Sequence, residues 1–244
     1  TTNNAKILKR AITIRADDRS KTYGDTIALG STAFSLTSGS FVGSESISSA
    51  TLSSSNSYDS STTQNAGTYV NELGISAAVA DAGFLHDNYE LTYDFGDLTI
   101  DKRALVLTAD NRNKTYGDSL VLGTTAFTKT SGTYANSELA TAVILASSNN
   151  YDSSTNQAVG SYANEIQISG ATGSGGFLES NYAVTYNDGE LSISQRPITI
   201  RADDRSKTYG ESLSLGATAF SVTSGSLANS ETLSSATLNS TNNY

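Results

Sequence analysis

The chain has 244 residues and a formal net charge of −9 at pH 7, with one proline and no cysteine, methionine or tryptophan. An acidic surface repels nucleic acids and anionic membranes, so no nucleic-acid partner is expected. Without cysteine there are no disulfides and no thiolate metal sites. No apolar run approaches the ~18 residues of a membrane span.

One motif, Lys-Thr-Tyr-Gly followed by an acid, occurs three times, with its tyrosines at Tyr23, Tyr116 and Tyr209. The spacing is constant (116 − 23 = 93 and 209 − 116 = 93), and the flanking residues follow the same period. Such self-similarity indicates tandem copies of one unit. We predict the last strand of a preceding repeat at 1–9, two β repeats at 10–102 and 103–195, and a partial third β repeat at 196–244.

Each repeat opens with alternating apolar and polar residues, as at Ile12, Ile14 and Ala16, which is the period of a half-buried strand. A polar turn then leads into the motif. Gly24 is expected to adopt a positive φ or to let another backbone come close. Tyr23 is expected to lie over the edge of the core with its hydroxyl bonded locally.

Further strands are predicted at 32–36, around Ala50 and Leu52, and from Gly67, where Tyr69, Asn71, Leu73 and Ile75 are expected to face one way. Ser44-Glu45, with its copies Ser137-Glu138 and Ser230-Glu231, is predicted to cap one short helical turn. A loop ending in Gly83-Phe84-Leu85 is predicted to close one end of the core.

The repeat is predicted to end in a hairpin, with Tyr89, Leu91 and Tyr93 on one strand and Leu98 and Ile100 on the other. The corresponding turn in the second repeat reads Asn187-Asp188-Gly189, and Asp-Gly between alternating strands is a strong hairpin signal. The chain then enters the next repeat with almost no linker. Adjacent repeats are therefore predicted to be joined semi-rigidly, as links of an extended rod.

Six strands in 93 residues without a long helix predict an all-β fold of tandem small domains. Two topologies fit: an immunoglobulin-like sandwich, or a β-grasp-like sheet with at most one short helix. The positions expected to be structural are aromatic residues and glycines that recur one period apart: Tyr23, Gly24, Phe34, Tyr69, Tyr89, Tyr116, Gly117, Phe127, Tyr162, Tyr182, Tyr209 and Gly210.

Four segments in combination resemble the MBG repeat of the YGX type, and the resemblance covers essentially the whole chain. They are Asp-Asp-x-Ser-Lys-Thr-Tyr-Gly-Asp (17–25), Gly-Thr-Tyr (67–69), Asn-Tyr-x-x-x-Tyr (88–93) and Gly-Asp-Leu-Thr-Ile (96–100). Such repeats occur in tandem in large bacterial surface proteins, including filamentous-haemagglutinin-like adhesins. The resemblance implies a β-rich stalk module of an exported adhesin, extracellular or at the bacterial cell surface, without catalytic residues.

The chain offers no recurring acid–base or nucleophile set, so we do not expect an enzyme. The only histidine, His86, is replaced by Glu179 one period later. A metal site made of several histidines therefore cannot form within one chain. His86 is expected to be an ordinary surface residue.

Calcium is the one cofactor that the residue types suggest, because carboxylates gather near the motif and calcium prefers oxygen ligands. The alternative is a solvated turn in which the carboxylates pair with Arg19 or Lys21 or cap backbone amides. The candidate ligands are Asp17, Asp18, Asp25, Asp110, Asp118, Asp203 and Asp204.

Two more hypotheses rest on recurring side chains. Lys21, Lys114 and Lys207 recur, as do Glu72 and Glu165, and some surface adhesins cross-link a Lys to an Asn or Asp beside a buried Glu. A lysine beside a turn is, however, ordinarily exposed. The 13 tyrosines suggest a sugar-stacking face, but a tyrosine at an alternating position more often fills the core.

The predicted function is a structural stalk or spacer that extends a binding tip from the cell surface for adhesion or biofilm formation. The alternative is a set of weak carbohydrate- or protein-binding modules that act by avidity. The expected partners are neighbouring repeats of the same chain, with host or matrix glycans or proteins contacted through other parts. We expect no membrane span.

Overall fold

The computed structural model describes residues 6–81 and 83–241. In this part of the chain the regular structure consists of β-strands and two 3-10 helices, with no α-helix, so the all-β prediction is confirmed. None of its helical segments has the length and apolarity that crossing a bilayer requires.

The first repeat contains seven strands and one 3-10 helix: β1 (Arg10–Ala16), β2 (Arg19–Thr22), β3 (Phe34–Ser38), β4 (Ile47–Ser54), β5 (Gly67–Ala80), η1 (His86–Asn88), β6 (Tyr89–Asp94) and β7 (Gly96–Asp101). The second repeat has the same series: β8 (Arg103–Ala109), β9 (Arg112–Thr115), β10 (Phe127–Gly132), β11 (Leu139–Ser147), β12 (Gly160–Ser174), η2 (Glu179–Asn181), β13 (Tyr182–Asn187) and β14 (Gly189–Ser194). The third contributes β15 (Thr199–Ala202) and β16 (Phe220–Ser224).

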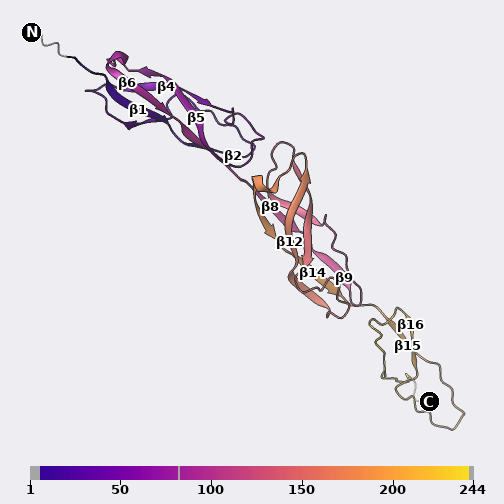
Figure 1. The fold of residues 1–244 in the computed structure, drawn as a ribbon. Coiled ribbons are helices and arrows are strands. Elements are labelled where there is room, and N and C mark those ends of the chain that lie inside the picture. The colour runs from indigo at the N-terminus through magenta and orange to yellow at the C-terminus, as the bar shows by residue number, and fades with distance from the viewer. Residues whose placement is uncertain (1–5, 82, 242–244) are drawn as a thin grey trace, which may run out of the picture. The chain divides into compact units, whose positions relative to one another are not determined.

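Two sheets make up each of the first two repeats. In the first repeat their strand orders are β3-β1-β6 and β2-β7-β5-β4, and in the second β10-β8-β13 and β11-β12-β14-β9. The strands of the first repeat are the indigo to purple arrows in Figure 1. Two sheets with only a 3-10 turn between strands match the sandwich alternative better than the β-grasp alternative.

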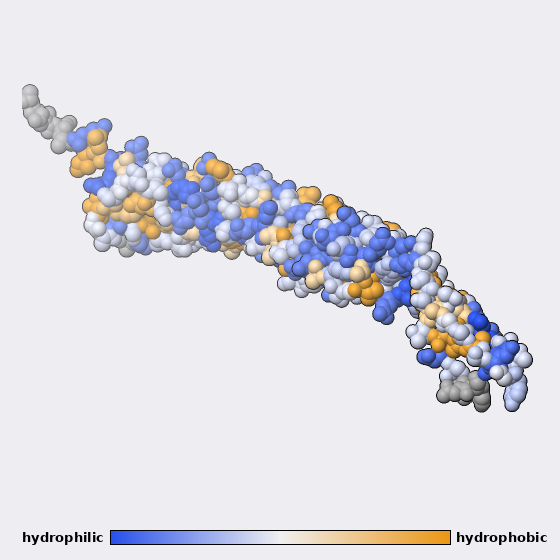
Figure 2. Space-filling view, turned by 90° about the horizontal axis from the view of Figure 1, so that it is seen from below, coloured by the Kyte–Doolittle hydropathy of each residue, from blue (hydrophilic) through white to orange (hydrophobic). Residues whose placement is uncertain are grey.

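The core of the first repeat lies between the inner faces of these sheets. Ile12, Ile14 and Ala16 of β1 are almost completely buried, as are Leu98 and Ile100 of β7. The predicted alternation is therefore correct for both strands. Burial of each large side chain contributes about 1.5–3 kcal/mol, which is how a small repeat without disulfides can fold. On the face in Figure 2, hydrophobic residues (orange) form scattered patches among hydrophilic ones.

Two chain segments, β1 with β2 and β6 with β7, run parallel to each other through both sheets. β1 pairs with β6 in parallel from Arg10↔Tyr89 onward, and β2 pairs with β7 in parallel from Arg19↔Leu98 onward. The offset is the same in both pairs (89 − 10 = 79 and 98 − 19 = 79). Each segment therefore leaves one sheet and continues in the other, and the predicted closing hairpin is wrong.

A glycine makes this change of sheet possible. A Cβ on Gly96 would clash with the carbonyl oxygen of Ala16, and one on Gly189 would lie 2.8 Å from the oxygen of Ala109. Neither glycine has a positive φ. The Asp-Gly sequence therefore marks a point where two backbones come close, and not a hairpin turn.

The alternation predicted from Tyr69 to Ile75 breaks at Asn71. This residue is exposed and has a φ of 57°, as does Asn164 of the second repeat with a φ of 56°. Tyr69 pairs with Leu98 but Leu73 pairs with Gly96, so β5 holds two more residues than its partner over this stretch. The irregularity explains why Leu73 and Ile75 face the core while Asn71 does not.

The predicted helical turn at Ser44-Glu45 and its copies is wrong. In the second repeat the amide of Glu138 donates to the carbonyl of Ala135 at 2.8 Å, and both central residues, Asn136 and Ser137, have a positive φ (49° and 63°). This is a type I′ turn. The helical turns occur instead at η1 and η2.

The loop that closes the core is confirmed. Phe84 is buried and stacks on Tyr89, with ring centroids 4.7 Å apart and an interplanar angle of 10°. Phe177 stacks on Tyr182 in the same way, at 5.1 Å and 23°. Each aromatic pair fills the end of a core that has no tryptophan.

The chain divides into two compact units, and their limits do not coincide with the repeats. The first unit contains the residues up to Val106 together with Lys129–Thr141 and Ala171–Thr185. The second contains Leu107–Thr128, Ala142–Gly170 and the residues from Tyr186 onward. The first unit thus combines the first repeat with three segments of the second.

Candidate functional site: the Tyr-Gly-acid junction

Within the first compact unit, the recurring tyrosine of the first repeat packs against residues of the second. Tyr23 is 3% exposed, and its ring meets that of Tyr182 edge to face with centroids 5.8 Å apart. Its hydroxyl donates a hydrogen bond to Glu138 Oε1. The expected burial of Tyr23 is confirmed, but its hydroxyl partner lies in the next repeat and is not local.

Glu138 joins two tyrosines. Its Oε2 accepts a hydrogen bond from the Tyr182 hydroxyl at 2.6 Å, and that hydroxyl in turn accepts the amide N–H of Ala135 at 3.0 Å. The carboxyl group is buried, and its charge is stabilised by these short O–H donors. Burial, and then the bond to Glu138, raise the pKa of both Tyr23 and Tyr182 above the usual tyrosine value.

Gly24 is required for two reasons. Its φ is +87°, a conformation that side chains disfavour, and a Cβ placed on it would lie 2.5 Å from the Cβ of Ala135. The expected positive φ is confirmed. The group that comes close is a side chain of the next repeat and not a backbone.

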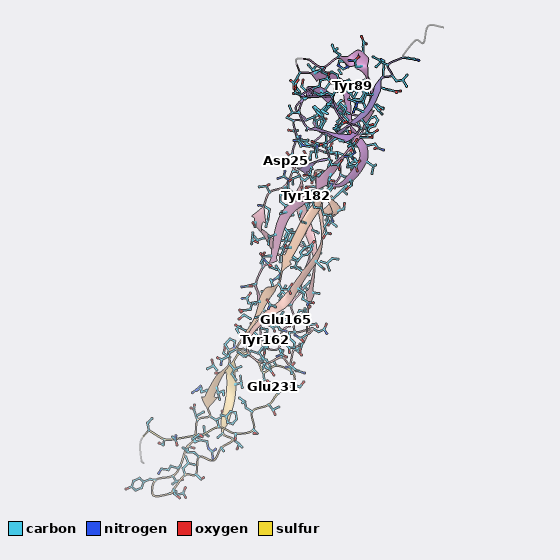
Figure 3. All side chains as sticks on the ribbon, turned by 90° about the vertical axis from the view of Figure 1, so that its left-hand side faces the viewer. Asp25, Tyr89, Tyr162, Glu165, Tyr182 and Glu231 are labelled. Atoms are coloured by element: carbon cyan, nitrogen blue, oxygen red, sulfur yellow. The ribbon has the colours of Figure 1, made fainter. Side chains whose placement is uncertain are left out.

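Arg103, the first residue of β8, binds the rest of the motif. Its Nε donates to the carbonyl oxygen of Tyr23 at 2.7 Å, and its Nη2 pairs with the carboxylate of Asp25. Its Nη1 donates to Thr133 Oγ1 at 3.2 Å. Asp25 of the first repeat and Tyr182 of the second repeat, which both take part in the contacts around Tyr23, are labelled in Figure 3.

A second line of hydrogen bonds runs beside the motif. The buried Asn181 accepts the amide N–H of Ala66 at 2.9 Å through Oδ1 and donates to Asn65 Oδ1 at 3.0 Å through Nδ2. Asn136 Nδ2 donates to the carbonyl of Thr62 at 2.8 Å. We name the whole set of contacts around Tyr23, Gly24 and Asp25 the junction.

The second compact unit contains several of the same contacts one period later. Arg196 Nε donates to the carbonyl of Tyr116 at 2.8 Å, and the Tyr116 hydroxyl donates to Glu231 Oε1 at 2.5 Å. A Cβ on Gly117 would clash with Ala228. Asn229 Nδ2 donates to the carbonyl of Thr155 at 2.9 Å, as Asn136 does to Thr62.

The three motif tyrosines differ in exposure because different residues pack over each of them. Tyr23 is buried against Glu138 and Tyr182, whereas Tyr116 meets Glu231 and is half-buried. Tyr209, which none of these partners covers, is fully exposed. The motif tyrosine is therefore buried by the next repeat, and not by its own.

Sequence reasoning missed the partners of the motif. Arg103, Glu138 and Asn181 were not among the expected structural residues, although each recurs one period away: Arg10 and Arg196, Glu45 and Glu231, and Asn88. That recurrence was the available signal. It did not indicate which of the recurring residues lie together.

Recurring buried charges hold one loop of each repeat. Lys21 is only 7% exposed, so the expectation of an exposed lysine is wrong. Its Nζ donates to the main-chain carbonyls of Tyr58 and Ser61, and burial lowers its pKa. Lys114 donates to the carbonyls of Tyr151 and Ser154 in the same way. Because these bonds go to main-chain carbonyls, they do not support the hypothesis of a lysine cross-link.

A buried carboxylate holds the N–H groups of the same loop. Glu165 accepts hydrogen bonds from the Ser147 hydroxyl, from the Asn149 amide N–H at 3.0 Å and from Asn149 Nδ2 at 2.7 Å. Burial alone raises the pKa of Glu165, but these bonds together outweigh it and lower that pKa to about 2. Glu72 makes the corresponding bonds to Ser54 and Asn56.

The remaining aromatic positions expected to be structural are half-buried. Phe34 and Phe127 are in this class. The hydroxyl of Tyr69 accepts from Gln64 Nε2 and donates to the carbonyl of Asn65, each at 2.7 Å. Tyr162 repeats this arrangement with Gln157 and Ala158. These hydroxyls are therefore already engaged within the repeat.

The candidate calcium ligands are held by hydrogen bonds and ion pairs. Asp18 pairs with Arg15 and accepts the amide N–H of Asp97, rather than pairing with the expected Arg19 or Lys21. The other pairs are Asp17–Ser35, Asp25–Arg103, Asp110–Thr128, Asp118–Arg196, Asp203–Ser221 and Asp204–Arg201. Within residues 6–81 and 83–241, no three metal-binding side chains gather into a group that could hold an ion.

His86 lies on the 3-10 turn η1. Its Nε2 lies 3.2 Å from the carbonyl of Ala78, and its ring meets Phe84 edge to face at 5.0 Å. A carbonyl can only accept, so this nitrogen carries a proton. His86 is exposed, as predicted for a surface residue, and these contacts hold its ring against Ala78 and Phe84.

Comparison with known proteins identifies the repeats. The family model of the MBG domain (YGX type) matches residues 12–99 and again residues 105–192, in tandem. Repeats of this family are typical of bacterial surface proteins. No curated protein and no solved structure matched the chain.

Proposed function

Because the chain belongs to the MBG domain family of the YGX type, we propose that its repeats are spacers in the stalk of an exported bacterial adhesin. The stalk holds a binding tip away from the cell surface for adhesion or biofilm formation. On this proposal the chain works outside the cell, is not an enzyme and uses no cofactor. Its main partners are neighbouring repeats of its own chain.

The observation that supports this most directly is the use of the recurring motif. Tyr23, Gly24 and Asp25 contact residues that belong to the next repeat, and not an open ligand site. A spacer needs a reproducible joint of this kind, because its reach depends on how consecutive repeats are linked.

Drift at other positions also supports a spacer. His86 is replaced by Glu179, Leu36 by Lys129 and Arg15 by Thr108 one period later. A ligand site repeated for avidity would need the same surface side chains in each copy. A spacer needs only the core and the junction to recur.

Small-angle X-ray scattering on the full chain tests the proposal. We expect a maximum dimension close to the summed lengths of the repeats. Gly24→Ala should broaden the distance distribution, because the new methyl meets Ala135. Gly210→Ala is the matched control: its φ is +91° against +87° for Gly24, and nothing lies within 4 Å of the added Cβ. A compact wild-type particle would defeat the spacer proposal.

The alternative, weak glycan or protein binding by each repeat, has less support. It requires tyrosines exposed together, but Tyr23 and Tyr89 are buried, and the half-buried Tyr69 and Tyr93 have bonded hydroxyls. Glycan-array binding that the full chain retains after Tyr69→Ala and Tyr162→Ala would argue against a role for these tyrosines. Binding that both changes abolish would favour the alternative.

A further inference from the structure

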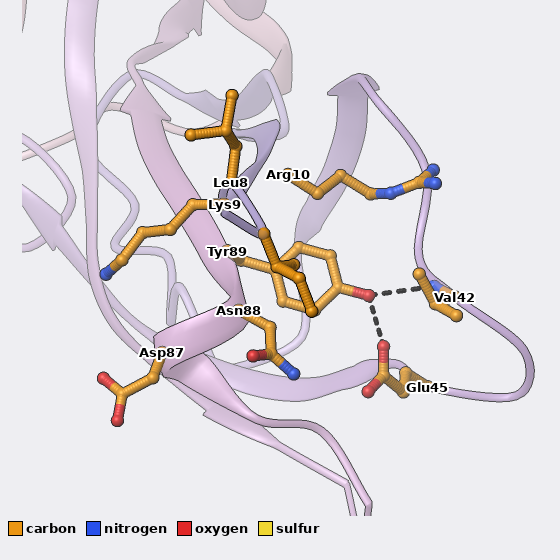
Figure 4. Close-up of a pocket in the computed structure, with 9 residues that line it drawn as sticks. Leu8, Lys9, Arg10, Val42, Glu45, Asp87, Asn88 and Tyr89 are labelled. Atoms are coloured by element: carbon orange, nitrogen blue, oxygen red, sulfur yellow. Dashed lines mark hydrogen bonds between the residues drawn. The ribbon is translucent and has the colours of Figure 1, made fainter. Parts of the chain in front are cut away.

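The pocket beside Tyr89 repeats the architecture of the junction and is therefore not a separate site. The Tyr89 hydroxyl accepts the amide N–H of Val42 at 2.9 Å and donates to Glu45 (Figure 4). Tyr182 makes the same kind of bonds inside the junction. Another pocket of the first repeat takes no part in the junction.

This second pocket lies where β1, β5 and the crossing from β6 to β7 meet, and β1, β5 and β6 are labelled in Figure 1. Its volume is about 360 Å³, which is near the lower end of the range for ligand sites and suits a single side chain. Its walls combine apolar, amide, carboxylate and guanidinium groups, from Arg15, Val70, Asn71, Asp94, Phe95 and Asp97. We call it the Phe95 pocket.

Hydrogen bonds within the repeat fix the frame of the Phe95 pocket. Arg15 pairs with Asp18 at 2.6 Å, and Asp18 also accepts the amide N–H of Asp97 at 2.8 Å. Asp97 in turn accepts the amide N–H of Asn71 at 2.9 Å, at the irregularity of β5 where Asn71 has a φ of 57°. The frame is therefore set before a ligand binds, which lowers the ordering cost of binding.

Several groups in the Phe95 pocket are left open. The carboxylate of Asp94 and the side-chain amide of Asn71 make no hydrogen bond or ion pair to the described part of the chain. Phe95 is 49% exposed, and its ring lies over Gly74, whose added Cβ would be 3.5 Å from Cε1 of that ring. Val70 is 69% exposed. The pocket thus offers an aromatic ring and an apolar side chain together with a free carboxylate.

The charge around the Phe95 pocket is negative. Asp18, Asp94 and Asp97 contribute three carboxylates and Arg15 one cation, so the formal charge is 1 − 3 = −2. A cationic ligand is therefore complementary. Among the described residues, no three metal-binding side chains gather closely enough to hold a metal ion, so an organic cation fits better.

The second repeat uses the equivalent groups internally. Asp188 stands in place of Phe95, and its carboxylate accepts a main-chain amide of its own repeat at 3.1 Å. Asn187 stands in place of Asp94 and donates to a threonine hydroxyl of its own repeat at 3.4 Å. The open ring and the free carboxylate are therefore features of the first repeat and not of the second, which supplies an internal control.

We propose that the Phe95 pocket binds an arginine side chain of a partner protein. The guanidinium lies over the open face of the Phe95 ring and donates to the Asp94 carboxylate, while Val70 contacts the methylene groups of the ligand. Arginine fits better than lysine, because its planar guanidinium both stacks on a ring and gives two N–H groups to one carboxylate. A neutral sugar would stack on the ring but would leave the charge of −2 uncompensated.

This inference goes beyond the spacer proposal. It gives the first repeat a lateral contact that the second repeat lacks, so it is a single site and not a set of copies acting by avidity. A spacer with or without this contact has the same length, so the scattering experiment and the binding experiment have independent outcomes.

A ¹⁵N-edited NMR titration of the full chain with acetyl-glycyl-arginyl-glycinamide tests the proposal. The amide signals of Val70, Asn71 and Phe95 should shift together, with a Kd on the order of 1 mM, and the signals of their equivalents one period later should not. The matched probe has citrulline in place of arginine, which keeps the shape and removes the charge, and it should not bind. Equal shifts with the citrulline peptide, or in both repeats, would overturn the proposal.

Substitutions locate the site. Asp94→Asn introduces the residue of the second repeat and should weaken binding about two- to fivefold without changing the unfolding midpoint, because Asp94 has no bond to lose. Phe95→Ala should weaken it by a similar factor. Asp87→Asn makes the same change of charge at an exposed position outside the pocket and should have no effect.

Competing ligands complete the test. A lysine peptide of the same length that binds as tightly as the arginine peptide would overturn the assignment to arginine. N-acetylglucosamine oligomers that shift the same three amides, when the arginine peptide shifts none, would assign the pocket to a glycan instead.

Discussion

At the scale of single residues, the junction depends on one buried carboxylate. Each carboxylate oxygen of Glu138 accepts a hydrogen bond from one tyrosine hydroxyl, and the two tyrosines belong to different repeats. A carboxylate without a cationic partner is costly to bury, and the two charge-assisted bonds offset that cost. If either tyrosine is removed, part of this compensation is lost.

Tyr23→Phe should destabilise the first compact unit by about 1–3 kcal/mol, because a buried carboxylate oxygen is left without a donor. Glu138→Ala should cost a similar amount. The double variant should cost less than the sum of the two, which a double-mutant cycle by urea unfolding measures. Tyr209→Phe is the control and should change nothing, since its hydroxyl is exposed. Strict additivity at Tyr23 and Glu138 would mean that the bond has no energetic role.

The same bond predicts a response to alkali. The pKa values of Tyr23 and Tyr182 are raised in the folded state, so the stability they contribute is complete below the unfolded value of about 10. It falls as the pH rises through the folded values, when a phenolate would face the Glu138 carboxylate. Unfolding free energies at pH 8 and pH 11 should therefore differ more in the wild type than in Tyr23→Phe. Equal differences would contradict this assignment.

Glu165 predicts the opposite response, at acid pH. Its pKa is lowered from 4.5 to about 2, so its contribution is complete above pH 4.5 and is lost as the pH falls toward 2. Glu165→Gln should cost about 2–3 kcal/mol at pH 7, because an amide NH₂ replaces an oxygen that accepts several bonds. At pH 2 the difference should shrink. The exposed Glu90→Gln is the control, and an equal loss there would remove the special role of Glu165.

Some of these residues could be anticipated from the sequence and some could not. The recurrence of Tyr23 and Gly24 indicated a structural role, and both are central to the junction. The partner of Tyr23 lies 115 residues away, and recurrence alone does not say which positions meet across a repeat boundary. Lys21 was expected to be exposed, because nothing local shows that Tyr58 and Ser61 direct carbonyls toward it.

At the scale of elements, alternation identified strands correctly but not their sheets. Ile12 and Ile14 in β1 and Leu98 and Ile100 in β7 face the core as predicted. Alternation is identical for a hairpin and for a strand that crosses from one sheet to the other. The Asp188-Gly189 pair suggested a hairpin because glycine serves both positive φ and close approach. Only the pairing of β7 with β2 distinguishes the two.

Gly96→Ala tests the crossing of the strands. The added methyl would meet the carbonyl of Ala16, which cannot move without disturbing β1, so we expect a loss of about 1–3 kcal/mol. Gly189→Ala should behave likewise in the second repeat. Gly74→Ala is the control: Gly74 also has no positive φ, and its added Cβ meets first a side-chain atom, Ser53 Oγ at 3.1 Å, and not a carbonyl oxygen. Thermal unfolding that ranks Gly96→Ala as neutral would refute the close approach.

At the scale of the whole molecule, the 93-residue period correctly indicated an array of similar units. The period gave the limits of each repeat. The compact units have different limits, because the contacts of the junction group parts of the second repeat with the first. A sequence period reports where copies begin and cannot report which copies pack together. Stability of such a chain is a sum over repeats plus a contribution from each junction.

If each junction contributes separately to stability, a second substitution in the junction should restore part of the stability lost in Gly24→Ala. Gly24→Ala should lower the unfolding midpoint because its methyl would lie 2.5 Å from that of Ala135. Ala135→Gly removes the second methyl, so the double variant should recover the part of the loss that is due to contact. The part due to the φ of +87° should remain, and Gly210→Ala measures it independently. A double variant no more stable than Gly24→Ala would place the whole effect in the backbone.

The parallel course of β1–β2 and β6–β7 has a mechanical consequence. Tension on the chain enters the first repeat at Arg10 and leaves near Asp101, at opposite ends of two segments that pair side by side. The segments must then slide past each other, and their hydrogen bonds carry the load together in shear. In a hairpin with adjacent ends, the bonds would unzip one after another. The same bonds therefore withstand a larger pulling force in this arrangement, which is the property that the proposed spacer would need.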